Sequence, residues 1–300
     1  MNGGEQGRDW LSAACVGALR IDERSERLTP VTRDSVTEDV VAAAVRAAFD
    51  AGEIQRQAHG LLGRGDARTK SSRRDLVTDV DVACERAIVD TLRAVRPDWT
   101  IEAEEEVLDA ESGGPRWFVD PLDGTVNFFH GLPLFCVSIG LYDGTRPMLA
   151  VVHAPLLGET FVAVAGAGAH SIRPEHGAVP LRISEADSLS EAVLATGFPY
   201  RRGELEHSNL ENFARFFYDV RGLRRMGSAA LDLAFVAAGR LDAFWELHLS
   251  SFDVAAGALL VKEAGGRVAD AEGEDDWLRG GAIVAGPEAL VSTMIERIEG

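Results

Sequence analysis

The chain has 300 residues, of which 46% are hydrophobic and 26% charged, as is typical of a globular protein. Asp and Glu number 48 against 30 Lys and Arg, so the formal net charge is −18. This acidity argues against nucleic acid or an anionic membrane as the main partner, because both attract clustered Lys and Arg. The three cysteines form no CxxC pair, which argues against a zinc site or a disulfide framework.

No apolar run approaches the roughly 20 residues that a membrane-spanning helix needs. The first residues, MNGGEQGRDW, lack the basic region and apolar stretch of a secretory signal. We therefore expect a cytoplasmic protein that does not associate with membranes. Residues 1–34 show no sustained periodicity, which predicts a poorly ordered or peripheral N-terminal extension.

The region 35–185 is expected to form an α+β half. Apolar residues at helical spacing, preceded by a capping-box pair, predict a helix over 35–60. A second helix is predicted over 80–95. Short β-rich runs separated by Asp-Gly, Leu-Gly and Gly-Ala-Gly predict an antiparallel meander over 133–172.

The region 186–300 alternates short β-rich runs with helical patterns, which predicts a layered α/β half. The chain as a whole is therefore predicted to be an α/β protein, built from an α+β half and an α/β half without an internal repeat. The strands of the second half are expected at 192–198, 223–227, 241–246 and 282–286, and its helices at 209–220, 228–239, 251–266 and 288–298.

The segment WFVDPLDGT carries the most specific chemical signal. Residues 117–119 predict a buried strand, and Asp120 follows at its end. Pro121 is expected to stop the strand and Gly124 to permit a tight turn, so that Asp123 folds back beside the first aspartate. Two adjacent carboxylates repel each other unless a cation neutralises them. Oxygen ligands without Cys or His favour Mg²⁺.

Further acidic segments also lie where predicted elements begin or end. Taken alone, each has an ordinary explanation as a helix start or a solvated acidic face. Together with DPLDGT they predict carboxylates that converge on two adjacent cations, an arrangement suited to in-line attack on phosphorus. The start of the helix at Asp253, or the turn at Gly124, is expected to receive phosphate oxygens. The acidic segments are DLVTDVD with Asp79 and Asp81, IEAEEE with Glu102, Glu104, Glu105 and Glu106, and SSFDVAAG with Asp253.

The segments KSSRRDLVTDVD, IEAEEE, WFVDPLDGTVNFFHGLP and DVAAGALLVKEAGG follow one another in this order. Their combination resembles the inositol monophosphatase family of Mg²⁺-dependent, lithium-sensitive phosphatases, and only the N-terminal extension lies outside the resemblance. It implies a layered α/β/α/β/α sandwich, a homodimer, and hydrolysis of inositol 1-phosphate or a similar polyol phosphate by a metal-activated water.

The resemblance also implies a ligand set for two or three Mg²⁺ ions. Glu104 resembles the acidic ligand of the family's Gly-Glu-Glu turn, and Asp120 resembles the carboxylate that bridges two ions. Leu122 would bind through its backbone carbonyl, while Asp123 and Asp253 would complete the second ion site.

Catalytic and substrate-binding roles follow from the same resemblance. Thr125 and Asp81 resemble the hydroxyl–carboxylate pair that orients the attacking water, and a third, looser Mg²⁺ would depend on Glu104. Lys70 resembles the lysine of a mobile loop that helps to close the site. The implied substrate contacts are Asp123, Gly124 and Thr125 at the phosphate, and Ala229 and Glu246 at the inositol hydroxyls.

Some positions depart from the family pattern. Ala103 replaces a glycine in the acidic turn, and Phe252 replaces the tryptophan usual before the last aspartate. Because these positions meet the leaving group, histidinol phosphate and fructose 1,6-bisphosphate stay open as alternative substrates. A non-catalytic regulatory or binding protein on the same scaffold is the alternative from another functional class.

Two other motifs admit a functional interpretation. Arg201–Arg202 and Arg224–Arg225 are interpreted as surface pairs or a dimer contact, with binding of a second anionic group as the alternative. Ser228, in MGSAAL, is interpreted as a helix N-cap rather than as a nucleophile.

Overall fold

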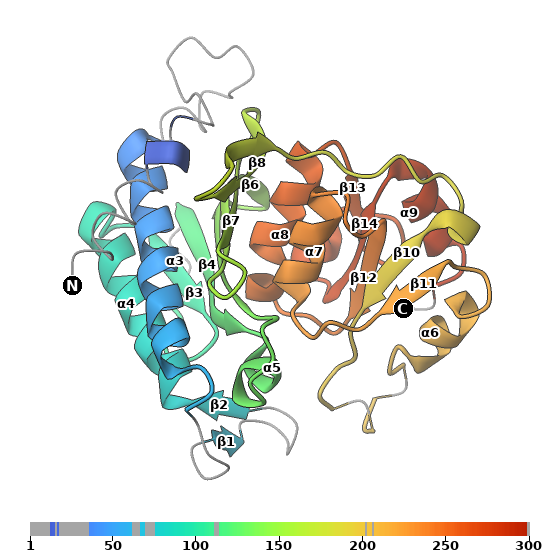
Figure 1. Ribbon diagram of the computed structural model, residues 1–300, viewed down its shortest axis with the longest axis horizontal. Coiled ribbons are helices and arrows are strands. Elements are labelled where there is room, and N and C mark those ends of the chain that lie inside the picture. Colours follow the sequence, from blue (N-terminus) through green and yellow to red (C-terminus); the bar gives the residue numbers. More distant parts are fainter. Residues whose placement is uncertain are drawn as a thin grey trace.

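The computed structural model describes residues 13–15, 17, 36–61, 67–69, 76–110, 114–201, 203–205 and 207–298. Its elements form the five layers α/β/α/β/α (Figure 1). Helices α3 and α4 cover the outer face of a seven-stranded sheet, α7 and α8 lie between the two sheets, and α6 and α9 cover a five-stranded sheet. The helices are α3 Glu38–Ala58, α4 Asp79–Val95, α5 Thr125–Phe129, α6 Leu210–Phe216, α7 Ala229–Ala237, α8 Ser251–Glu263 and α9 Glu288–Ile295, with 3₁₀ turns at Leu189–Glu191 and Asp276–Leu278.

The seven-stranded sheet has the order β3-β4-β5-β6-β7-β8-β9. Strands β3 and β4 are parallel, and the other neighbours are antiparallel, so the predicted meander is confirmed. The bounds are β3 Thr100–Ala103, β4 Pro115–Asp123, β5 Cys136–Asp143, β6 Arg146–Ala154, β7 Glu159–Val164, β8 Gly168–Arg173 and β9 Gly177–Pro180.

Strand β4 corrects one prediction. Pro121 does not stop the strand, which continues to Asp123. Between Asp120 and Asp123 the pairing with β5 shifts register, so the proline occupies an irregular stretch of the ladder. A proline lacks the N–H that a regular ladder uses, and such irregularities are where strands accommodate it.

The five-stranded sheet has the order β11-β10-β12-β14-β13. Strand β10 runs parallel to β11 and β12, whereas β14 is antiparallel to β12 and β13. The predicted alternation of strands and helices is confirmed, and only β13 was not anticipated in this sheet. The bounds are β10 Val193–Thr196, β11 Gly222–Arg224, β12 Ala243–Leu247, β13 Arg267–Ala269 and β14 Ala282–Gly286; a separate pair consists of β1 Ala67–Thr69 and β2 Leu76–Thr78.

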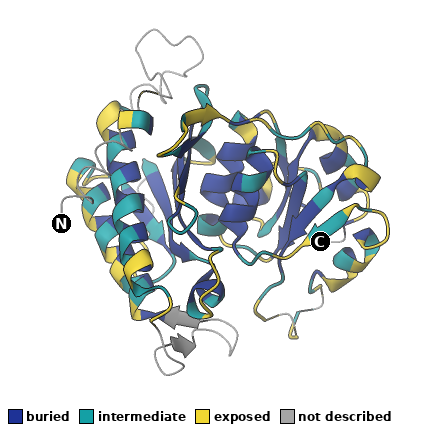
Figure 2. Cartoon of the chain, viewed as in Figure 1, coloured by how far each residue is buried: buried dark blue, intermediate teal, exposed yellow. Residues whose placement is uncertain are grey.

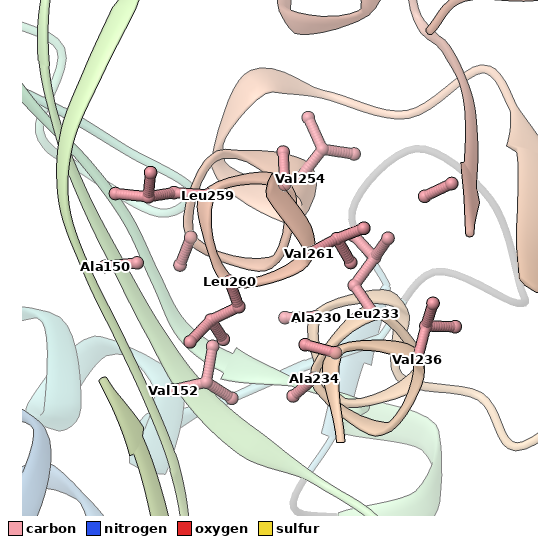
Figure 3. Close-up of a cluster of buried hydrophobic side chains, with 14 of the residues drawn as sticks. Ala150, Val152, Ala230, Leu233, Ala234, Val236, Val254, Leu259, Leu260 and Val261 are labelled. Carbon is pink, nitrogen blue, oxygen red and sulfur yellow. The ribbon is translucent and has the colours of Figure 1, made fainter. Parts of the chain in front are cut away.

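Helices α7 and α8 form the buried centre of the molecule (Figure 2). One hydrophobic cluster combines their side chains with side chains from both sheets. Figure 3 shows Ala150 and Val152 of β6 opposite Leu259 and Leu260 of α8. Both halves of the chain therefore contribute side chains to this core. The boundary between the two halves, at residues 185 and 186, stays a prediction from the sequence.

Small residues let α8 lie close to the larger sheet. A Cβ atom built on Gly140 of β5 would lie only 2.9 Å from Cβ of Ala255. This close packing brings the N-terminus of α8, and with it Asp253, toward the C-terminal end of β4. None of the helices in the described part of the chain is long and apolar enough to cross a membrane.

Candidate active site

A cavity of about 320 Å³ lies where β4, β10 and β12 end and where α7 and α8 begin. Glu104, Asp123, Ala229, Glu246 and Asp253 line it, so five of the predicted site residues meet there. Most other members of the predicted set are joined to this cavity by the contacts described below. Lys70 lies outside the described residues.

The turn that follows Asp120 is held by backbone and side-chain hydrogen bonds. The N–H of Leu122 donates to Asp120 Oδ1 at 2.9 Å. The buried amide of Gln55, on α3, donates to the carbonyl oxygen of Pro121 at 2.7 Å. Gly124 has φ of 99°, and a Cβ atom there would lie 2.9 Å from the carbonyl oxygen of Leu134. Only glycine fits both restrictions.

Asp123 connects this turn to the start of α7. Its Oδ2 accepts hydrogen bonds from the hydroxyl of Ser228 and the N–H of Ala230, each at 2.7 Å. Burial raises the pKa of Asp123 to about 6, although these two hydrogen bonds act in the opposite direction. Ser228 is the N-cap of α7, as predicted, but its hydroxyl serves Asp123 rather than the helix.

Asp81 and Thr125 are in contact, as the sequence resemblance implied. The Thr125 hydroxyl lies 3.2 Å from Asp81 Oδ1 and 3.1 Å from the carbonyl oxygen of Leu122, and its single proton can serve one of them at a time. The other oxygen of Asp81 accepts from the N–H and hydroxyl of Thr78, at 2.9 and 2.5 Å. This capping box fixes the carboxylate at the start of α4.

The acidic turn that carries Glu104 is held by a residue that the sequence analysis missed. The buried carboxylate of Glu85, on α4, accepts hydrogen bonds from the backbone N–H groups of Glu105, Glu106 and Val107 at 2.7, 2.8 and 2.9 Å. A carboxylate that accepts from consecutive N–H groups fixes the path of the turn. No local spacing rule connects residues 20 or more positions apart, so this contact had no signal in the sequence.

Glu102 lies in the same acidic segment but has a structural contact instead. It accepts hydrogen bonds from Arg116 and Arg279, each at 2.9 Å. The Arg279 guanidinium also donates to the hydroxyl of Ser251 at 3.0 Å. Glu102 thereby connects the β3 edge to the first turn of α8, two residues before Asp253.

The buried environment of the acidic side chains around the cavity disfavours their charged forms. Burial raises the pKa of Asp120 well above its usual value, and nearby Glu104, Asp123 and Asp253 raise it further. Burial, Glu104, Asp123 and Glu246 likewise raise the pKa of Asp253. The carboxyl group of Glu104 is close enough to Asp120 to favour a proton on Asp120. A bound cation would replace that proton, so the donor set fits a hard divalent ion.

The described side chains are not arranged as a completed chelate. No three His, Cys, Asp or Glu side chains among them are close enough together to hold an ion. Asp253 Oδ2 instead accepts from the N–H of Ser250 at 2.6 Å, and Asp123 accepts from the groups named above. These contacts use Oδ2 of each carboxylate, and such outer partners orient a carboxylate that binds an ion through its other oxygen.

The opposite end of the cavity carries a second set of ionisable groups. Burial raises the pKa of Glu246 to about 8, partly offset by the guanidinium of Arg225. Asp232, on α7, lines the same end. Arg225 is exposed, as expected for a surface arginine, and it also lines the cavity. Its position depends on how α7 packs, which no local pattern reveals.

A sequence profile of the Inositol monophosphatase family matches residues 36–299. The chain belongs to this family. Nus factor SuhB of Pseudomonas aeruginosa is 43% identical over 263 residues, which cover 85% of this chain and 94% of that protein. Inositol-1-monophosphatase of Mesorhizobium japonicum is 37% identical over 275 residues, which cover 90% of this chain and 98% of that protein.

Solved structures of the inositol monophosphatase family have the same fold. The structure of inositol monophosphatase from Anabaena superposes with a TM-score of 0.75 at 35% identity, covering 85% of this chain and 93% of that chain. The family resemblance and the fold class expected from the sequence are thus confirmed. Membership supports a phosphatase whose site uses metal ions and accepts a small phosphorylated substrate.

Proposed function

We propose that the protein is a Mg²⁺-dependent phosphomonoesterase that hydrolyses inositol 1-phosphate, or a similar polyol phosphate, to the free alcohol and phosphate. The observation that carries this proposal is the convergence of Asp120, Asp123, Asp253 and Glu104, whose mutual electrostatic repulsion a divalent cation would relieve. The same residues match the family motif. We also propose that it works as a cytoplasmic homodimer and is inhibited by Li⁺, as the family resemblance implies.

In this proposal two or three Mg²⁺ ions are held by Glu104, Asp120, Asp123, Asp253 and the carbonyl oxygen of Leu122. When bound, such ions activate a water molecule and neutralise the phosphate and the leaving oxygen. The four carboxylates therefore have the same role. They supply negative charge to the ions at a buried position where water solvates that charge poorly.

Thr125 and Asp81 are the side chains that would orient the attacking water. A Thr125 hydroxyl that donates to Asp81 leaves the carbonyl of Leu122 available to an ion. It also leaves the hydroxyl oxygen able to accept a hydrogen bond from the attacking water and so to orient it. Water so oriented attacks phosphorus in line with the leaving alcohol, with inversion and without a covalent enzyme intermediate.

Substrate binding is assigned to groups at the two ends of the cavity. Asp123, Gly124 and Thr125 are proposed to contact the phosphate, the last two as hydrogen-bond donors. Ala229 and Glu246 are proposed to contact hydroxyls of the leaving alcohol. The Glu246 carboxylate lies directly over Gly197, where a Cβ atom would be 2.1 Å from Oε2, so this glycine makes room for it.

Phosphate release from a substrate panel tests the proposal. Inositol 1-phosphate, histidinol phosphate, fructose 1,6-bisphosphate and 3′-phosphoadenosine 5′-phosphate would each be assayed with Mg²⁺, with EDTA, and with Li⁺ added. We expect Mg²⁺-dependent, Li⁺-inhibited release that is strongest for inositol 1-phosphate. Stronger release from another member would keep the metal-dependent reaction and change the substrate.

A second candidate function follows from the names of the relatives. Several relatives at about 40% identity, including that of P. aeruginosa, are named Nus factor SuhB. We therefore retain a regulatory or protein-binding role on the same scaffold as the alternative. Absence of release from every substrate, by a folded protein that binds Mg²⁺, would favour this alternative.

A further inference from the structure

Asp232 is a buried carboxylate without a hydrogen-bond partner among the described residues. It lies in the first turn of α7, is 2% exposed, and lines the active-site cavity. Its Oδ1 atom is inaccessible to solvent and has no partner in the described part of the chain. Burying an acidic group without a hydrogen-bond partner is unfavourable. Such a group requires an explanation, and a ligand in the cavity that Asp232 lines can supply a donor to its carboxyl group.

The surroundings of Asp232 identify the end of the cavity where that ligand would lie. Burial raises the pKa of Asp232 well above its usual value and nearby Glu246 raises it further, whereas Arg225 lowers the pKa of both acids. Arg225 and His248 are the only basic residues among those that line the cavity. The Arg225 guanidinium favours the ionised, hydrogen-bond-accepting form of both carboxylates without forming an ion pair with either in the described structure.

We propose that Asp232 is a specificity residue that accepts a hydrogen bond from a second donor on the leaving alcohol, beside the donor that Glu246 accepts. This inference rests on the proposed function, since it assigns the alcohol end of the same cavity. It requires a substrate whose carbon skeleton carries two neighbouring donors in addition to the phosphate ester. A phosphomonoester with a bare aromatic leaving group has none.

Hydroxyl and ammonium groups offer the same donor chemistry, and two substitutions distinguish them. Asp232→Asn keeps a neutral acceptor oxygen of the same shape, which still serves a hydroxyl. It removes the negative charge that an ammonium group needs. Asp232→Ala removes the acceptor for both. A polyol phosphate should therefore tolerate Asn but not Ala, whereas an amino-alcohol phosphate should tolerate neither.

The experiment compares kcat/KM for inositol 1-phosphate, histidinol phosphate and p-nitrophenyl phosphate at saturating Mg²⁺. For whichever of the first two the unmodified protein hydrolyses better, Asp232→Ala should lower kcat/KM at least about ten-fold relative to p-nitrophenyl phosphate, mainly through KM. An equal effect on all substrates, or no effect, would overturn the assignment. Asp219→Ala, at a surface ion pair with Arg297, is the charge-matched control.

The stability of the free protein gives a readout that does not depend on turnover. Because Asp232 lacks a partner, Asp232→Asn and Asp232→Ala should leave Tm unchanged or raise it when no substrate is present. A lower Tm for both variants would show a structural role and overturn the proposal. If the unmodified protein hydrolyses none of the substrates, the proposed function fails and this inference fails with it. A changed selectivity without that failure supports both.

Discussion

The Ser228 hydroxyl donates a 2.7 Å hydrogen bond to Asp123 Oδ2 across 105 residues of sequence. It joins the first residue before α7 to the last residue of β4. This contact connects a helix that packs between the sheets to the carboxylate that is expected to bind both ion and phosphate. The geometry of the candidate site therefore depends on how the two halves of the chain pack together.

Replacing Ser228 with alanine should weaken Mg²⁺ binding. The substitution removes a hydrogen bond that favours the charged form of Asp123, and loss of such an outer partner costs about 10–100-fold in metal affinity. The Mg²⁺ concentration for half-maximal activity should rise by that factor, with a smaller change at saturating Mg²⁺. Ser228→Thr keeps the hydroxyl and should retain most of the affinity. Equal Mg²⁺ dependence in all three proteins would contradict the role assigned to this contact.

Replacing Glu85 should loosen the turn that carries Glu104. Glu85→Ala leaves backbone N–H groups of Glu105, Glu106 and Val107 without their acceptor. We expect a loss of about 2–5 kcal/mol in the free energy of unfolding by urea, because each hydrogen bond to a charged acceptor contributes about 1.5–3 kcal/mol and these donors are only partly buried. Glu106→Ala, which removes an exposed ion pair with Arg86, is the control and should change stability by less than about 1 kcal/mol. Similar losses in both variants would refute the special role of Glu85.

The metal-free protein should lose stability as the pH rises. Burial raises the pKa of Glu246 to about 8, whereas an unfolded glutamate titrates near pH 4.3. Between these values the folded state holds the extra proton, so unfolding becomes easier as pH increases. In EDTA, Glu246→Gln should reduce the difference in unfolding free energy between pH 5 and pH 8 by on the order of a few kcal/mol. An unchanged difference, matching the surface control Glu211→Gln, would count against this protonation state.

Glu159 should give the opposite pH dependence. Burial opposes ionisation, but hydrogen bonds from Arg240, Arg173 and a serine outweigh it and lower the pKa of Glu159 to about 2. Its stabilisation is therefore complete above the unfolded pKa and is lost as pH falls toward 2. Glu159→Gln should be less stable at pH 7 by about 1–3 kcal/mol, since both arginines remain partly solvated. The variant should also lose less stability on acidification, as followed by circular dichroism, and a parallel loss would be the contrary result.

Local patterns predicted the helices, the strands and the acidic segments, whereas the five-layer arrangement and the ligand set were implied by the family resemblance. Periodicity placed α3, α4 and the strand–helix alternation, and the DPLDGT motif placed Asp120 and Asp123. Most contacts over long sequence separations were missed, and the pair of Asp81 and Thr125 was implied only by the family resemblance. Glu85, Ser228 and Asp232 acquire their surroundings only when helices pack against strand ends, and each alone looks like an ordinary helix residue. Pro121 was misjudged because the register shift that accommodates it depends on pairing with β5.

The central claim is that Asp120 holds metal ions for phosphate ester hydrolysis, and Asp120→Asn tests it most directly. Phosphate release from inositol 1-phosphate would be measured with Mg²⁺ for both proteins, together with Tm in EDTA. We predict that activity falls more than about a hundred-fold, beyond the cost of losing an outer-shell partner. The Tm should be unchanged or higher, because a buried carboxyl is removed. Activity within a few-fold of the unmodified protein, or a loss that merely follows unfolding, would contradict the claim.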